Sequence, residues 1–224
     1  MKRLAIILLA LCLCLSGCGG KPKKGAGSTA GGWTPNPDGG TDFPEEAAES
    51  FRDAMADYPG VGYVPMAYLG SQVVAGTNYA FLCRNTTLSV EPVTTLTAVV
   101  VYRNLGGSSS ILRFRDVSFT AFSSDYTPET GDVVGGWRLN TEYVGTLPAE
   151  AQSAFEKAAP DTEETSYIPL ALLGTQVVAG RNYAVLCTAV TQGEETWKEL
   201  CILIIYEDPS GSASVSAVRG FEIP

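Results

Sequence analysis

The chain has 224 residues, of which 45% are hydrophobic, with 15 Lys and Arg against 24 Asp and Glu. Its formal net charge of −9 argues against a nucleic-acid partner, because few basic side chains are left to neutralise phosphates. Histidine is absent, which excludes Ser-His-Asp triads, Cys-His dyads and His-ligated zinc or haem. We therefore expect a protein that is not an enzyme and that uses no cofactor and no metal.

The first 17 residues have the parts of a secretory signal. Lys2 and Arg3 precede an apolar run over 4–15, which is too short to span a bilayer. Leu-Ser-Gly over 15–17 then leads to Cys18, an order that resembles the bacterial lipobox. The resemblance implies a diacylglycerol on the Cys18 thiol and cleavage before it, whereas a plain secretory signal cut elsewhere is the alternative. We expect an exported protein held at a membrane by its N-terminal lipid, at a cell surface or facing a periplasm.

Residues 18–30 are rich in Gly, Lys and Ser without an apolar period, which predicts a flexible tether. The rest of the chain contains one unit twice. GSQVVAGTNYAFLC at 70–83 matches GTQVVAGRNYAVLC at 174–187, and at this offset of 104 residues 33 of 89 aligned positions are identical without a gap. The predicted domains are a first repeat over 31–119, a linker over 120–134 and a second repeat over 135–224.

Each repeat is predicted to begin with a helix. Pro44 opens the first helix, apolar residues recur at helical spacing, and Pro59-Gly60 ends it, while Pro148 and Pro160 bound the second. Strands separated by Gly- and Pro-containing turns follow. These strands are expected at 63–74, 77–85, 96–102 and 111–119, and again at 167–178, 181–190, 200–206 and 215–223. We therefore predict an α+β fold class, with two tandem domains that each pack one helix on a four- to five-stranded antiparallel sheet.

The middle strands are apolar on both faces. If the hairpin of the second repeat turns around Glu194, the equivalent register in the first repeat puts Tyr79 and Phe81 on one face and Ala80 and Leu82 on the other. One helix can cover only one of these faces. We expect the second face to be buried against the other repeat or against the linker.

The first hairpin of each repeat carries Gln-Val-Val-Ala-Gly, at 72–76 and 176–180. This pentapeptide resembles the Gln-x-Val-x-Gly signature of the cystatins, which inhibit papain-like cysteine proteases, and the longer run QVVAGTNYAFLCR is similar to the same region of that family. The order of a glycine-containing segment, a helix, the signature hairpin and further strands is also similar. The resemblance covers both repeats and implies a tandem cystatin-like protein.

In the cystatins, an N-terminal segment, the signature hairpin and a second hairpin line one edge and fill the protease cleft. The resemblance implies that the hairpins of this chain, its Gly-Gly-Trp segment and Leu105 would contact a protease. The residues so implied are Gln72, Val73, Val74, Ala75, Gly76, Gln176, Val177, Val178, Ala179, Gly180, Gly31, Gly32, Trp33 and Leu105. Glycine at 76 and 180 permits positive φ and close approach of the backbone to a partner.

Two features depart from the family pattern. The second hairpin of cystatins often bears Pro-Trp, whereas the corresponding turns here are Asn-Leu-Gly-Gly at 104–107 and Asp-Pro-Ser-Gly at 208–211. The N-terminal segment of the second repeat is also continuous with the linker. A second hypothesis therefore stands beside protease inhibition, that of a non-inhibitory cell-surface binding or scaffold module whose partner is another surface protein or a glycan. A third hypothesis is a structural spacer.

Three cysteines lie within the repeats. In the expected register Cys187 faces Cys201, so a cross-strand disulfide is compatible with an exported protein. Cys83 occupies the position equivalent to Cys187 but faces Thr97, which instead favours a small buried apolar role for these cysteines. Both interpretations stay open at this point. A cysteine nucleophile is not expected, because there is no histidine to activate it.

Overall fold

The computed structural model describes most of both repeats. The described residues are 31–39, 43–58, 61–117, 135–142, 145, 147–159, 164–193 and 195–224. The predicted signal, Cys18 and the tether lie outside them, as do the predicted linker over 120–134, Glu194 and the predicted helix ends at Pro59-Gly60 and Pro160.

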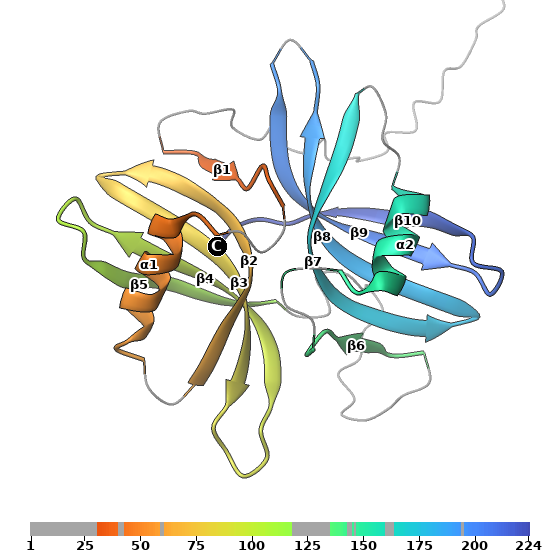
Figure 1. Ribbon diagram of the computed structural model, residues 1–224, viewed down its shortest axis with the longest axis horizontal. Helices are drawn as coiled ribbons and strands as arrows, with labels where there is room; N and C mark the ends of the chain where they lie inside the picture. Colours follow the sequence, from red (N-terminus) through yellow and green to blue (C-terminus); the bar gives the residue numbers. More distant parts are fainter. Residues whose placement is uncertain are drawn as a thin grey trace, which may run out of the picture.

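Each repeat forms a five-stranded antiparallel sheet with one helix (Figure 1). The strand order is β1-β2-β3-β4-β5 in repeat 1 and β10-β9-β8-β7-β6 in repeat 2. Repeat 1 consists of β1 (Trp33–Pro35), α1 (Glu45–Met55), β2 (Val61–Val74), β3 (Gly76–Thr87), β4 (Thr94–Arg103) and β5 (Ser109–Val117). Repeat 2 consists of β6 (Trp137–Leu139), α2 (Ala149–Ala158), β7 (Thr165–Val178), β8 (Gly180–Thr191), β9 (Trp197–Glu207) and β10 (Ala213–Gly220).

The predicted α+β class is wrong, because the described residues are mostly β. The two helices in this part of the chain have 11 and 10 residues, whereas β2 and β7 alone run for 14 residues each. Short first strands, β1 and β6, add a fifth strand to each sheet. The helix is therefore a cover over part of one sheet face, and it does not form half of the fold. One helix on each sheet remains compatible with the arrangement expected.

Each helix packs on one face of its own sheet. In α1 the buried residues include Ala47, Phe51 and Ala54, which recur at helical spacing, and Glu45 and Glu46 in the first turn interact favourably with the helix dipole. The ring of Phe51 meets that of Phe81 on β3 edge to face, with centroids 4.9 Å apart. In repeat 2 the ring of Phe155 lies in the corresponding cluster with Val185 and Leu203.

The opposite faces of the two sheets form one shared core. It contains 18 buried hydrophobic residues, and each has its counterpart 104 residues away in the same cluster. These residues are Met66, Ala67, Leu69, Ala80, Leu82, Leu96, Ala98, Val100 and Val117 with Leu170, Ala171, Leu173, Ala184, Leu186, Leu200, Ile202, Ile204 and Phe221. The second sheet face was predicted to be buried against the other repeat or the linker, and the described residues show it packed against the other repeat. The same face of each repeat is the partner of the other.

Polar contacts also join the repeats. The Thr188 hydroxyl donates to the carbonyl oxygen of Asn36 at 2.7 Å, and both residues are buried. Arg84 donates to the Thr141 carbonyl, and the Arg115 guanidinium lies 5.4 Å from the centroid of the Phe221 ring. Because a buried polar contact requires a defined geometry, the bond between Thr188 and Asn36 helps to fix the relative orientation of the sheets.

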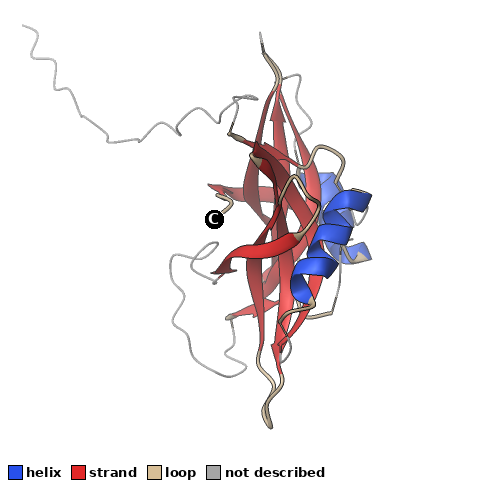
Figure 2. Cartoon of the chain, turned by 90° about the vertical axis from the view of Figure 1, so that its left-hand side faces the viewer, coloured by secondary structure: helices blue, strands red, loops and turns tan. Residues whose placement is uncertain are grey.

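The two repeats are related by an approximate twofold rotation about the viewing direction of Figure 1, with β1 at the upper left and β6 at the lower right. Figure 2 shows both helices on the same side of the molecule. Among the described residues, neither helix has the length and apolar character needed to cross a membrane.

Candidate functional site

The three segments implied by the cystatin resemblance meet at one end of each sheet. In repeat 1, β1 pairs with β2 as far as Gln72, and β3 begins at Gly76. Thr77 on β3 pairs with Arg103, the last residue of β4, and the turn 104–107 follows directly. We call the end formed by residues 31–33, 72–76 and 104–107 tip 1, and the equivalent end formed by residues 135–137, 176–180 and 208–211 tip 2.

The signature hairpin turns tightly at both tips. Val74 pairs with Gly76, so that Ala75 alone stands between the two strands. Gly76 has a φ of +124°, a conformation that L side chains rarely adopt. A Cβ atom there would lie 2.3 Å from the backbone oxygen of Arg103, so a larger residue would also push β4 away. Gly180 has the same φ and the same 2.3 Å approach, to the oxygen of Glu207.

A tyrosine on the neighbouring strand holds each turn. The Tyr102 hydroxyl donates to the carbonyl oxygen of Ala75 at 2.6 Å, and that of Tyr206 donates to Ala179 at 2.6 Å. These bonds connect the hairpin to the strand that leads into the second turn of the tip. The sequence does not predict this role. It shows that Tyr102 and Tyr206 occupy equivalent positions, but it does not show which group their hydroxyls contact.

The glutamine of the signature links the N-terminal segment to the hairpin. Gln72 Nε2 donates to the carbonyl oxygen of Gly31 at 2.7 Å, and Gln72 Oε1 accepts from Asn78 Nδ2 at 2.7 Å. Gln176 makes the same two bonds, to Gly135 and from Asn182, at the same distances. The Gln therefore orients the glycine segment and the hairpin relative to each other, and its amide is occupied within the protein.

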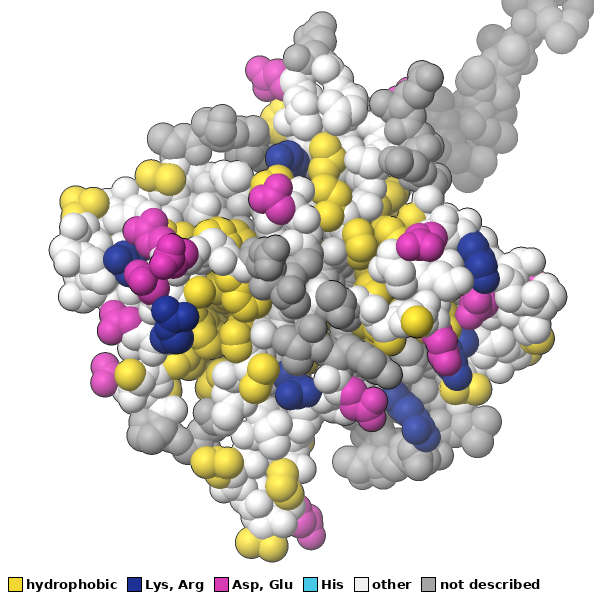
Figure 3. Space-filling view, in the orientation of Figure 1, with side chains coloured by type: hydrophobic (Ala, Val, Ile, Leu, Met, Phe, Trp, Pro, Cys, Tyr) yellow, Lys and Arg dark blue, Asp and Glu magenta, His cyan; other side chains and the backbone are white. Residues whose placement is uncertain are grey.

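The apolar side chains of the hairpins are exposed. Val73 is 69% and Val74 42% exposed at tip 1, and Val177 is 57% and Val178 40% exposed at tip 2. Leu105, in the second turn of tip 1, is 88% exposed. Ala75 and Ala179 are also exposed. Yellow hydrophobic side chains are accordingly visible at the left-hand end of the molecule in Figure 3, where both hairpin ends of repeat 1 lie.

Trp33 belongs to the shared core more than to the surface of tip 1. It pairs with Gln72 in the β1–β2 ladder and packs, partly buried, against the core between the sheets. Trp137 lies in the same way in repeat 2. Each Trp therefore anchors the first strand on the sheet face opposite the helix. Gly31 and Gly32 remain at the surface beside the hairpin.

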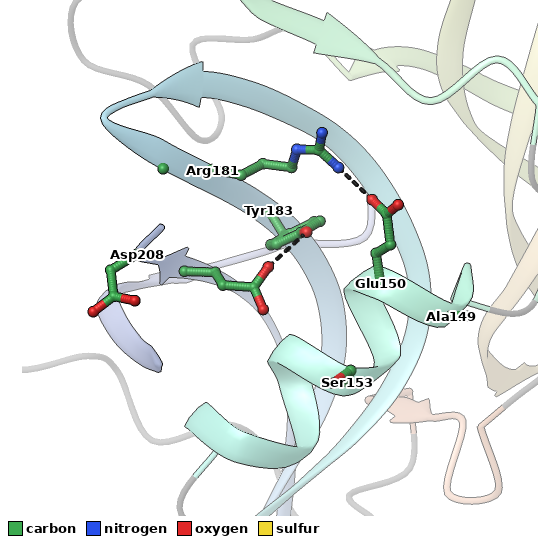
Figure 4. A pocket seen from close by; sticks show the side chains of 8 residues that line it. Ala149, Glu150, Ser153, Arg181, Tyr183 and Asp208 are labelled. Carbon is green, nitrogen blue, oxygen red and sulfur yellow. Dashed lines mark hydrogen bonds and ion pairs between the residues drawn. The ribbon is translucent and has the colours of Figure 1, made fainter. Parts of the chain in front are cut away.

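Tip 2 borders a recess of about 540 Å³ between α2 and the ends of β8 and β9 (Figure 4). Four of its side chains form two pairs. Arg181 forms an ion pair with Glu150 on α2, and the Tyr183 hydroxyl donates to Glu207 Oε2 at 3.0 Å. Burial is the main reason that the pKa of Tyr183 is raised, so the phenol stays neutral and acts as a donor. A partner that reaches past Gly180 would meet these groups.

Asp208 shapes the second turn of tip 2. Its Oδ1 accepts from the backbone N–H of Ser210 at 2.8 Å and from that of Ser212 at 3.0 Å, and the Ser210 hydroxyl donates to the same oxygen. These donors, led by the Ser210 side chain, lower the pKa of the Asp208 carboxyl. At tip 1 the Asn104 side-chain oxygen accepts in the same way from Gly106 and Ser108.

The cysteines of the repeats are buried free thiols. Cys187 pairs with Cys201 and Cys83 with Thr97, so the predicted register is confirmed. Burial raises the pKa of all three thiols, that of Cys201 to about 12. They are therefore poor nucleophiles near neutral pH. Cys18, the predicted lipidation site, lies outside the described residues.

Searches with the whole sequence give no match to a protein-family model and none among curated proteins. The structure of the tips is therefore the basis for inferring what they bind. They offer exposed apolar side chains at the ends of their hairpins.

Proposed function

We propose that the chain is an exported, lipid-anchored tandem protein of cystatin-like type that binds papain-like cysteine proteases through its tips. The observation that carries the proposal is the meeting of three separate segments at one end of a sheet. The glycine segment, the exposed Val73–Val74 edge and the turn bearing Leu105 lie together at tip 1. Exposed apolar side chains at the ends of hairpins can enter a cleft.

Inhibition by such an end is steric. The exposed valines of the hairpin would lie against the walls of the cleft, and Gly76, which is buried against β4, would keep the turn that carries them tight. The turn needs no reorganisation, because Tyr102 and Gln72 already hold it through hydrogen bonds of 2.6 and 2.7 Å. A preorganised surface loses little conformational entropy on binding, which favours affinity.

The alternative proposal is a surface-binding or scaffold module without inhibitory activity. The feature that favours it is the second turn of tip 2, where Asp208, Pro209 and Ser210 stand in place of an apolar contact. The turn at tip 2 would suit a polar partner surface better than an apolar cleft. In this case the tips would bind the surface of another protein, and they would not block the active-site cleft of a protease.

A titration of papain activity with the fragment 31–224, which contains every described element, tests the proposal. We expect inhibition that weakens at least tenfold when Val74 and Val178 are both changed to Asp, because the charges would be desolvated in the cleft. Val218→Asp is the matched control, since Val218 is 53% exposed on β10 away from the tip residues. Full papain activity at a large molar excess of the fragment would overturn inhibition and leave the scaffold proposal.

A further inference from the structure

We propose that the two tips bind two partner molecules at the same time, so that one chain holds two proteases at fixed opposite ends. The inference rests on the proposed function. The presence of two repeats does not by itself require that one chain binds two partners, or that the two sites bind independently. Two repeats packed with their tips side by side would admit only one protease.

Tip 1 and tip 2 lie at opposite ends of the long axis of the molecule. In Figure 1 the β2–β3 and β4–β5 turns of repeat 1 point to the left, and the β7–β8 and β9–β10 turns of repeat 2 point to the right. The approximate twofold rotation carries one tip into the other, and because each tip lies far from the rotation axis, the two tips lie on opposite sides of the shared core. A protease at one end therefore has the whole width of both sheets between it and the other.

Each tip is complete within one repeat. The three segments of tip 1 come from β1, the β2–β3 hairpin and the β4–β5 turn, and the bonds that hold them are made by Gln72, Asn78 and Tyr102 of the same sheet. The polar contacts between the repeats involve other residues, such as Asn36 with Thr188. Binding at one tip therefore uses no group of the other repeat.

The shared core keeps the tips apart. Its 18 buried residues come in equal number from both sheets, and Leu82 and Leu186 within it are fully buried. Bringing the tips together would expose this core to water, at about 25 cal/mol for each Å² of apolar surface. The opposition of the tips is thus a property of the folded chain, and occupation of one tip should leave the affinity of the other unchanged.

The two sites are expected to differ in affinity. Tip 1 offers Leu105, which is 88% exposed, in its second turn, where tip 2 has Pro209 beside the ionised Asp208. Thr77 next to the hairpin of tip 1 is replaced by Arg181 at tip 2. An apolar cleft should therefore fill tip 1 at a lower concentration than tip 2.

The mass of the complex in solution tests the inference. The fragment 31–224 is mixed with excess papain whose catalytic cysteine has been alkylated, so that nothing is cleaved, and is measured by native mass spectrometry and light scattering after chromatography. We expect two papain molecules per chain. Val74→Asp and Val178→Asp should each reduce this number to one, and the double variant to none.

Separate outcomes bear on the two proposals. Saturation at one papain per chain, with each single variant still binding one, would mean that the tips exclude each other and would overturn the inference while leaving the proposed function intact. No binding by the unaltered fragment would overturn the proposed function and the inference with it. Circular dichroism of each variant shows whether it is folded. Val73→Asp is a second test at tip 1, because Val73 is more exposed than Val74 and its substitution should disturb folding less.

Discussion

The two repeats keep the same tip framework but carry different charges on it. Gly76 and Gly180 share a φ of +124°, and the hydrogen bonds of Tyr102 and Tyr206 have the same length of 2.6 Å. The residues that define backbone geometry are thus alike in both repeats. What differs lies around this framework, where a partner would make contact.

The ends of β4 and β9 show the difference most clearly. Arg103 at the end of β4 forms an ion pair with Glu46 on α1 at 3.3 Å. The equivalent residue on β9 is Glu207, which pairs with Lys157 on α2 at 3.5 Å. Both repeats therefore tie the strand end to the helix, with the sign of the charges reversed. The reversed polarity changes the charges that a partner would meet beside each tip.

The largest effect is expected in the shared core, which both repeats build together. Leu82→Ala and Leu186→Ala should each lower the free energy of unfolding by about 2–5 kcal/mol, because each removes a fully buried side chain. Since both leucines lie in one cluster, urea unfolding should remain a single transition that shifts as a whole in either variant. Val90→Ala is the control, since Val90 is fully exposed.

Two separate unfolding transitions, of which only one moves in each variant, would contradict this expectation. Small-angle scattering of the unaltered chain gives a second check on the same point. Curves that require two independently moving domains would show that the core between the sheets is not maintained in solution.

Next in size are the glycines of the hairpins. Gly76→Ala and Gly180→Ala should each cost about 1–3 kcal/mol, because φ is positive and the new Cβ would meet a backbone oxygen at 2.3 Å. The effects in the two repeats should agree closely, and thermal unfolding measures them. Gly220→Ala is the control, because nothing lies within 4 Å of a Cβ there and its φ is not positive. Unequal costs at 76 and 180 would indicate that the tips are less alike than their backbones suggest.

Much of the backbone could be predicted from the sequence. The repeat offset aligned the two sheets, and the assumption of a turn at Glu194 was sufficient to pair Cys187 with Cys201. The apolar character of both sheet faces, as at Phe81 and Leu82, also indicated that the second face is covered. Strand register follows from such patterns because a slip of one residue would turn every side chain to the wrong face.

The fold class and the inner contacts of the tips could not be predicted in this way. The helical spacing of apolar residues such as Ala47 and Phe51 predicted α1, but this spacing carries no information about how much of the fold is sheet, so the α+β class was wrong. The contacts of Gln72 with Gly31 and of Tyr102 with Ala75 join residues 41 and 27 positions apart. They depend on strand ends meeting in space, which no local pattern encodes.

A smaller effect is expected from the tyrosines that hold the turns. Tyr102→Phe and Tyr206→Phe each remove one hydrogen bond to a turn carbonyl, which should reduce stability by about 0.5–1.5 kcal/mol. Amide hydrogen exchange at residues 73–77 and 177–181 should accelerate in the repeat that carries the change and stay unaltered in the other. Faster exchange in both repeats would mean that the tips are coupled through the core, against the independence inferred above.

The smallest effect separates the two second turns by their response to acid. The donors around Asp208 lower its carboxyl pKa below the ordinary value of about 3.9, so its ionised form stabilises the folded state. That contribution is complete above about pH 4 and is lost as the pH falls through the folded-state pKa. Asn104 accepts equivalent bonds at 2.8 and 3.1 Å without titrating.

Exchanging these two residues should therefore exchange the acid sensitivity of the turns. We compare stability between about pH 5 and about pH 2.5, a range that brackets the ordinary carboxyl pKa. Over this range Asp208→Asn should lose less stability than the unaltered chain, and Asn104→Asp should lose more. Urea unfolding at each pH measures the difference. Curves that run parallel for all three proteins would mean that the Asp208 carboxyl is held no more strongly in the fold than in the unfolded chain. Opposite changes in acid sensitivity for the two variants would show that the side chain at 104 or 208 holds the second turn with the same geometry in both repeats. The charge of Asp208 would then be what distinguishes this turn of tip 2 from that of tip 1.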